Sequence, residues 1–261
     1  MRIWLVLLRK EWLELVRSYR LIWLPISFLV LGASQPIATY FLPDILAGSG
    51  DLPEDVIRSI PMPRASEVMA SSLQQFGTLG LLLIALSSMG AVSNERASGT
   101  AAMILVKPVS YLSFITSKWA SILSISWLSF AFGYGASWYY TASLFGSVGW
   151  RSVIASLLYF ALWLGFVGTL TLLFSSLLPS AAAAAFGSLA LAALLSISAK
   201  SLPFSQDWNP GRLSQLAADS LSSASPPGGS AWLTVAATAA ASAAALFFAA
   251  RSLRGRPLSA S

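Results

Sequence analysis

The sequence contains neither cysteine nor histidine, and charged residues make up only 10% of its 261 residues. The first two absences exclude disulfide frameworks, thiolate zinc sites, cysteine nucleophiles and every catalytic triad that uses imidazole as its base. The scarcity of charge excludes a soluble globular protein, because soluble domains are about 25% charged and about 45–50% apolar. This chain is 56% hydrophobic. Its composition therefore indicates an integral membrane protein.

A phosphate-binding loop of the form G-x-x-x-x-G-K-[ST] is also absent, so the chain has no ATP site of that kind. No Asp, Glu, Lys or Arg is expected well inside the apolar stretches, whereas ion-coupled carriers need ionisable groups within the bilayer. If the chain uses energy, another subunit must supply it. We expect no catalytic residue, no metal and no cofactor on this chain.

Six apolar stretches are each long enough to cross a bilayer, which takes about 20 helical residues. Pro25 and Pro36 predict a kink in the first stretch. Only the residues around Pro179 separate the fourth from the fifth, which predicts a tight helical hairpin. The expected fold is an all-α integral membrane protein with six transmembrane helices within residues 21–250. The stretches are residues 21–42, 72–92, 119–145, 152–178, 181–199 and 231–250.

Residues 1–20 show a helical pattern that is amphipathic and not membrane-spanning. Large apolar side chains, from Trp4 to Tyr19, recur on one side of the helix, and the basic side chains lie on the other. This pattern is typical of a helix in the membrane interface. The alternative is a helix packed on a soluble partner. The residues expected to characterise the interfacial helix are Trp4, Arg9, Lys10, Glu11, Trp12 and Arg17.

The basic residues distinguish the two sides of the membrane. Eleven Lys and Arg residues fall on the side that holds both termini, and five fall on the other side. The positive-inside rule makes the side with eleven cytoplasmic. We therefore expect a multi-pass protein of the cell (plasma) membrane, with outer loops 43–71 and 200–230 and a cytoplasmic basic tail, 251–261. Because this bias accounts for the positive charge, no nucleic-acid partner is expected.

The outer loops carry helix-start signals. Asp51 and Glu54 form a capping-box pattern, and Pro63 is expected to open an outward extension of the second span. Asn209 and Pro210 predict a helix start, followed by Leu213, Leu216, Ala217 and Leu221 on one face. We interpret this last segment as a helix at the outer membrane surface.

Three glutamines lie within the predicted spans. They offer neutral hydrogen bonds, either to a substrate along a path or between helices, and the second role is the commoner one in membranes. These residues are Gln35, Gln74 and Gln75.

The connection 93–118 between the second and third stretches carries the most information. Glu95 and Arg96 lie at the membrane edge, a short apolar turn follows, Pro108 breaks it, and a second helical stretch leads to Lys118. Apolar side chains such as Met103 on the cytoplasmic side need a cover. The segment is therefore expected to dock into a groove of a partner.

This connection resembles the intracellular segment of ABC-2-type transporter permeases. The resemblance rests on the order Glu-Arg-x-x-Gly-Thr, then Met-Ile-Leu-Val-Lys-Pro-Val-Ser, then Lys118 at the opening of the third span. The amphipathic start is similar to the elbow helix of that family, and six spans extend the resemblance over the whole chain. One position departs from the family pattern: Tyr111 stands where an Arg often follows the Pro-x-Ser. The residues that the resemblance assigns to ATPase coupling are Glu95, Arg96, Gly99, Thr100, Met103, Leu105, Pro108, Ser110 and Lys118.

The resemblance implies a permease subunit, expected in an exporter, that forms the substrate path. Its implied partners are separately encoded ABC ATPase subunits, which bind the ATP and Mg²⁺, and a second permease copy or a paralogue, all among membrane lipids. Two alternatives stay open at this point. One is a membrane-embedded lipid-modifying enzyme, and the other is a structural or regulatory membrane subunit that transports nothing.

Overall fold

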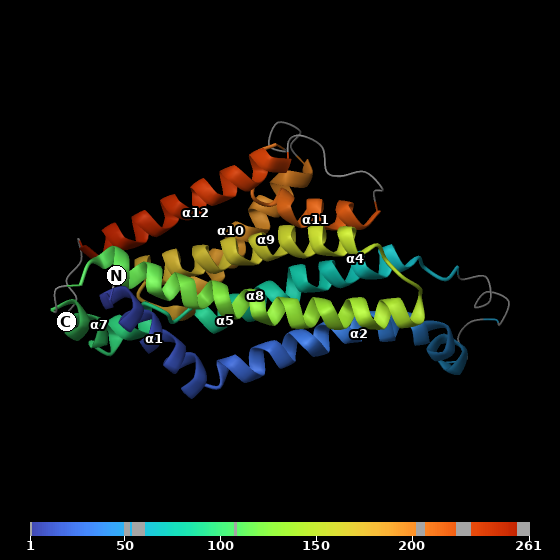
Figure 1. Cartoon of the computed structure of the whole chain (residues 1–261), viewed down its shortest axis with the longest axis horizontal. Helices are drawn as coiled ribbons and strands as arrows, with labels where there is room; N and C mark the ends of the chain where they lie inside the picture. The colour runs from blue at the N-terminus through green and yellow to red at the C-terminus, as the bar shows by residue number, and fades with distance from the viewer. Residues whose placement is uncertain are drawn as a thin grey trace.

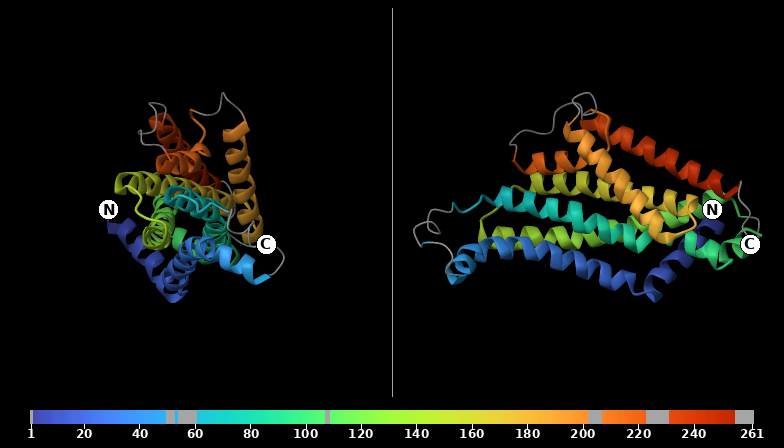
Figure 2. Two further views of the ribbon diagram at one scale, coloured as in Figure 1. Left: turned by 90° about the vertical axis from the view of Figure 1, so that its right-hand side faces the viewer. Right: turned by 180° about the vertical axis from the view of Figure 1, so that it is seen from behind.

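The computed structural model describes residues 2–49, 53, 61–106, 109–201, 207–222 and 231–254, which form helices and no strand. The long helices run side by side along one axis, and α1 crosses one end of the bundle at an angle (Figure 1). The end of α12 lies at the same end of the bundle as α1 (Figure 2). The helices are α1 (Arg2–Arg17), α2 (Arg20–Ser49), α4 (Ala65–Gln75), the π-helical turn η1 (Phe76–Gly80), α5 (Leu81–Ser88), α6 (Ser93–Ala97), α7 (Thr100–Leu105), α8 (Tyr111–Leu144), α9 (Trp150–Leu177), α10 (Ala181–Ser201), α11 (Arg212–Ser222) and α12 (Ala231–Arg254).

Among the described residues, five helical segments are long and apolar enough to cross a membrane. Each of them contains one of the predicted apolar stretches or most of it. The predicted stretch 119–145 lies almost wholly in α8, which has 34 residues and is rich in Ser, Trp and Tyr, and α8 is not among these five segments. The segments are Arg20–Gly48, Ala65–Ala97, Trp150–Leu177, Ala181–Ser201 and Ala231–Arg254.

Two features of the first helices extend beyond the sequence analysis. α2 includes Pro25, Pro36 and Pro43 within one helix and is longer than the stretch that predicted it. Tyr19, expected on the apolar side of the N-terminal helix, lies in the turn between α1 and α2 with φ 56° and is 69% exposed. A positive φ ends an α-helix, so the turn at Tyr19 sets the angle between α1 and α2.

The helical stretch predicted to lead to Lys118 is the start of α8. It is continuous with the third apolar stretch, so Lys118 lies two turns inside the helix. A side-chain cap begins it: the Oγ atom of Ser110 accepts a hydrogen bond of 3.1 Å from the backbone N–H of Ser113. The predicted break at Pro108 lies outside the described residues.

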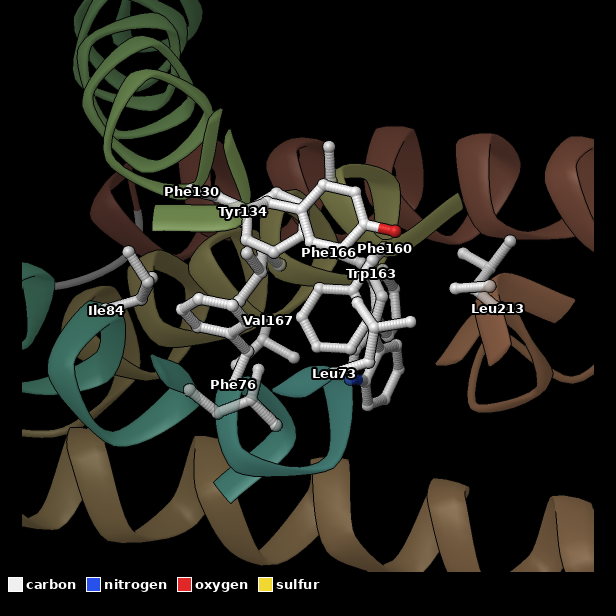
Figure 3. Close-up of a cluster of buried hydrophobic side chains, with 14 of the residues drawn as sticks. Leu73, Phe76, Ile84, Phe130, Tyr134, Phe160, Trp163, Phe166, Val167 and Leu213 are labelled. Carbon is white, nitrogen blue, oxygen red and sulfur yellow. The ribbon is translucent and has the colours of Figure 1, made fainter. Parts of the chain in front are cut away.

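The core is centred on α9, which packs against α8, α5, α10, α11 and α12. Trp163 and Leu164 are almost fully buried. Phe130 of α8 lies edge-on to Phe76 at 5.3 Å between ring centroids, and 5.0 Å from the ring of Phe160. Figure 3 shows these aromatic side chains from three helices meeting in one cluster.

The closest helix contact is between α2 and α8. A Cβ atom on Gly32 would lie 1.8 Å from the carbonyl oxygen of Gly133, and one on Gly133 would lie 2.4 Å from the carbonyl oxygen of Phe28. Only glycine permits this approach of two backbones, which is a common way to pack helices in a membrane.

The predicted hairpin and the helix expected after Pro63 are present. α9 ends at Leu177 and α10 begins at Ala181, and the two helices pack on each other. α4 begins after Arg64, whose backbone N–H donates to the Glu67 carboxylate at 3.1 Å. The helix predicted at Asp51 lies outside the described residues.

α11 follows the predicted start at Asn209, and Leu213, Leu216, Ala217 and Leu221 are buried together. These side chains face α9 and α4. The interpretation of α11 as a helix at the outer membrane surface was therefore incomplete, because protein and not lipid covers its apolar face.

Candidate functional site

Four charged residues from three separate segments meet at the end of the bundle where α1 lies. The ammonium group of Lys118 is 2.9 Å from the Glu11 carboxylate and 3.0 Å from the Glu95 carboxylate. The Lys118 side chain is only 1% exposed, and those of Glu11 and Glu95 are 10% and 11% exposed. A buried ammonium needs such partners, because an unpaired charge is costly away from water. Lys118 therefore ties α1 and α6 to α8.

Lys10 completes this group, which we call the charge cluster (Lys10, Glu11, Glu95 and Lys118). Its ammonium donates to Glu95 and, at 3.0 Å, to Glu11. Burial lowers the pKa of Lys10, but the carboxylates of Glu11 and Glu95 raise it more, so the net pKa lies above the usual value of 10.5. A raised lysine pKa contributes stability that is present below pH 10.5 and is lost only above it. Lys10 therefore gives the charge cluster no pH sensitivity near neutral pH.

The rest of α1 supports this contact. The indole N–H of Trp4 donates to the Oγ1 atom of Thr116 on α8 at 3.1 Å. Trp12 is half-buried, whereas Arg9 and Arg17 are exposed. The residues predicted for the interfacial helix thus divide into a face that contacts α8 and a face that is free of the bundle.

α9 fixes the position of α6 and hence of Glu95. The hydroxyl of Ser175 accepts hydrogen bonds from the backbone N–H groups of Val92 and Ser93, both at 3.1 Å, and donates to the carbonyl of Met89 at 2.6 Å. The guanidinium of Arg96 donates to the carbonyl of Ser176 at 3.1 Å. Arg96 is therefore a helix-to-helix contact, and Ser175 and Ser176 are contributors that sequence reasoning missed.

The other residues predicted to couple the chain to an ATPase lie between α6 and the start of α8. Gly99 has φ 74°, a conformation that favours glycine, and it turns the chain from α6 into α7. Thr100 begins α7, and its hydroxyl is 2.9 Å from that of Ser98. Leu105 ends α7, but its side chain lies outside the part of the chain that the structure describes. Ser110 caps α8, as shown above.

α7 presents apolar side chains at the end of the bundle. Ala101 is fully buried in a second apolar cluster with Phe114 and Leu253, whereas Met103 is 74% exposed and Val106 is 87% exposed. Ala101 therefore anchors α7, and Met103 and Val106 face away from the described bundle. Tyr111, at the position where the family pattern often has Arg, packs half-buried against the same cluster.

The three glutamines have different surroundings. The amide N–H of Gln75 donates to the hydroxyl of Ser34 at 3.1 Å, which links α4 to α2. Gln35 is half-buried in α2, and Gln74 is exposed. Gln75 thus contributes to helix packing, and the structure does not bring the three together into one site.

Three carboxylates near the charge cluster, those of Glu11, Glu14 and Glu95, offer oxygen atoms within 4.8 Å of one another. Lys10 pairs with all three and Lys118 with two of them. Two ammonium groups in the same small space repel a cation, so the arrangement fits an ion-pair network better than a metal site.

Comparison with known proteins identifies a family. Residues 5–252 match the family model described as "ABC-2 family transporter protein". The chain is 41% identical over 217 residues to "Uncharacterized transmembrane protein YxlG" of Bacillus subtilis (strain 168), a match that covers 83% of this chain and 84% of that protein. A family match over nearly the whole length identifies the chain as a member of the ABC-2 family of transporter membrane proteins.

Proposed function

We propose that this chain is the permease subunit of an ABC exporter. Six spans, with α8 as the third, form the substrate path, and a separately encoded ATPase provides the energy. The observation that carries the proposal is the charge cluster, which joins α1 and α6 to α8 by buried ion pairs. α8 then runs 34 residues along the bundle against α2 and α9. A displacement of α6 and α7 by a partner would thus be transmitted into the spans.

The proposed orientation places α1, α6, α7 and the end of α12 on the cytoplasmic side. The figures show α1, α7 and the end of α12 at one end of the bundle (Figures 1 and 2). The segments α1, α6 and α12 carry Arg9, Arg17, Arg96 and Arg251, so the positive-inside rule supports this orientation. A reporter active only in the cytoplasm, fused after Ser261, is expected to be active. An inactive fusion at normal expression, together with activity of an externally active reporter at the same site, would contradict this orientation.

Met103 and Val106 are the proposed ATPase contact. Each apolar side chain gains roughly 1.5–3 kcal/mol on moving from water into a partner groove. The double variant Met103→Asp/Val106→Asp is therefore expected to reduce co-purification of the ATPase at least tenfold and to leave membrane insertion unchanged. ATP hydrolysis is expected only when the ATPase is present.

The matched control is Met62→Asp. Met62 is 65% exposed, similar to Met103, but it lies just before α4 at the opposite end of the bundle. This variant should retain the ATPase at the wild-type level. Wild-type recovery of the ATPase with the double variant would show that α7 is only a connection between spans.

A further inference from the structure

We propose that the crevice between α8 and α12 binds one anionic phospholipid. One acyl chain would lie in an apolar groove within the bundle, and the headgroup would lie against Arg251 and Arg254 at the end of α12. This inference concerns a lipid site and does not depend on the proposed transport function.

The apolar groove lies where α8, α9 and α12 meet and has a volume of about 290 Å³. An apolar cavity of about 150 Å³ already binds benzene, so this groove has room for a hydrocarbon chain. Trp119 and Trp127 of α8 form one wall, and Ala239 and Ala243 of α12 form the other. No residue that lines it carries a charge.

The polar groups of the groove are already satisfied within the protein. The indole N–H of Trp119 donates to the hydroxyl of Thr169 at 2.9 Å, and that of Trp127 donates to the carbonyl of Ala161 at 2.8 Å. The hydroxyls of Thr169, Thr238 and Ser242 each donate to a carbonyl four residues earlier in their own helix. A polar ligand would find few free partners here, whereas an alkyl chain needs none.

A second groove, of about 760 Å³, lies between the start of α8 and the end of α12. Two of its lining residues are cationic, Arg251 and Arg254, and none is acidic. Tyr111 and Phe247 also line it. Basic pockets between helices at a membrane surface are typical binding sites for anionic lipid headgroups.

The two grooves follow one another along the same pair of helices, α8 and α12. Trp119 follows Tyr111 by eight residues, about 12 Å along α8. Leu246, which lines the apolar groove, precedes Ala250 of the basic groove by four residues on α12. The cationic groove thus lies at the end of the bundle and the apolar groove deeper within it. This order matches a phospholipid in a bilayer leaflet, whereas a soluble anion or an acidic protein segment would leave the apolar groove empty.

The test is native mass spectrometry of the purified chain in detergent, titrated with phosphatidylglycerol or phosphatidylethanolamine of identical acyl chains. We expect the first lipid to bind at one site per chain and at least tenfold more tightly than the second. Both lipids carry a phosphate, but the ammonium of phosphatidylethanolamine cancels its charge, and an attraction of about 1 kcal/mol for each of two arginines depends on the net negative charge. Arg251→Gln/Arg254→Gln should abolish this preference. Arg64→Gln/Arg151→Gln, two exposed arginines at the other end of the bundle, should retain it.

A second pair of variants tests the acyl chain separately. Ala243→Phe fills the apolar groove and should weaken the binding of both lipids about tenfold. Ala244→Phe changes the neighbouring exposed residue, which does not line the groove, and should leave the binding of both lipids unchanged. Equal binding of the two lipids by the wild type, wild-type affinity in Ala243→Phe, or competition by glycerol phosphate as effective as that of the lipid would overturn the proposal. The experiment contains no ATPase, so its failure is distinct from a failure of the proposed function.

Discussion

Replacing Lys118 with Met is expected to lower the free energy of unfolding by about 3–5 kcal/mol and to release α1 from the bundle. The variant removes the one nearly fully buried ammonium of the charge cluster and leaves Glu11 and Glu95 with Lys10 alone. Two buried carboxylates then share a single cation that is itself 36% exposed. The thermal unfolding midpoint in detergent measures the loss of stability.

Release of α1 is measured separately by thiol labelling. Since the chain has no cysteine, a single cysteine at position 116 reports on its surroundings without background. Thr116 is partly buried and hydrogen-bonded to Trp4, so a maleimide should modify Thr116→Cys faster when Lys118→Met is also present. Lys10→Met is the control, because Lys118 still pairs with both carboxylates in that variant. It should lower the free energy of unfolding by less than Lys118→Met does. Equal effects of the two lysine variants would contradict the role assigned to Lys118.

The second large effect is expected at the contact of α2 with α8. Gly133→Leu places a side chain where even a Cβ atom would lie 2.4 Å from the carbonyl oxygen of Phe28. Backbone cannot yield as a flexible side chain can, so the helices must separate. The expected loss is at least the roughly 1–3 kcal/mol of an overpacked core, with a marked fall in the yield of folded protein.

Gly135→Leu is the matched control for this variant. Gly135 lies two residues later in the same helix, and a Cβ atom there would meet nothing within 4 Å. The change in helix propensity is the same at both positions. The difference in stability between the two variants therefore measures the effect of the close backbone contact alone. Similar thermal midpoints for the two variants would show that the backbone contact does not hold α2 on α8.

Local patterns in the sequence predicted the helices well. The apolar stretches, the hairpin around Pro179 and the buried face of α11 all follow from spacing within a few turns of one helix. The residues singled out in segment 93–118 include Glu95 and Lys118, which the structure brings together with Lys10 and Glu11. The helical stretch predicted between Pro108 and Lys118 is present as the first two turns of α8, which Ser110 caps.

The sequence by itself determined that this chain is helical, apolar and suited to a membrane. Only the tertiary structure decided which helices meet. Glu11 and Lys118 are 107 residues apart, and nothing in either segment specifies the other. The same holds for Gly32 with Gly133, and for α11 with α9 and α4. The physical reason is that lipid is as apolar as a protein core, so hydrophobicity marks a span without telling its protein-facing side from its lipid-facing side. That choice depends on close packing and on the pairing of buried charges between distant segments.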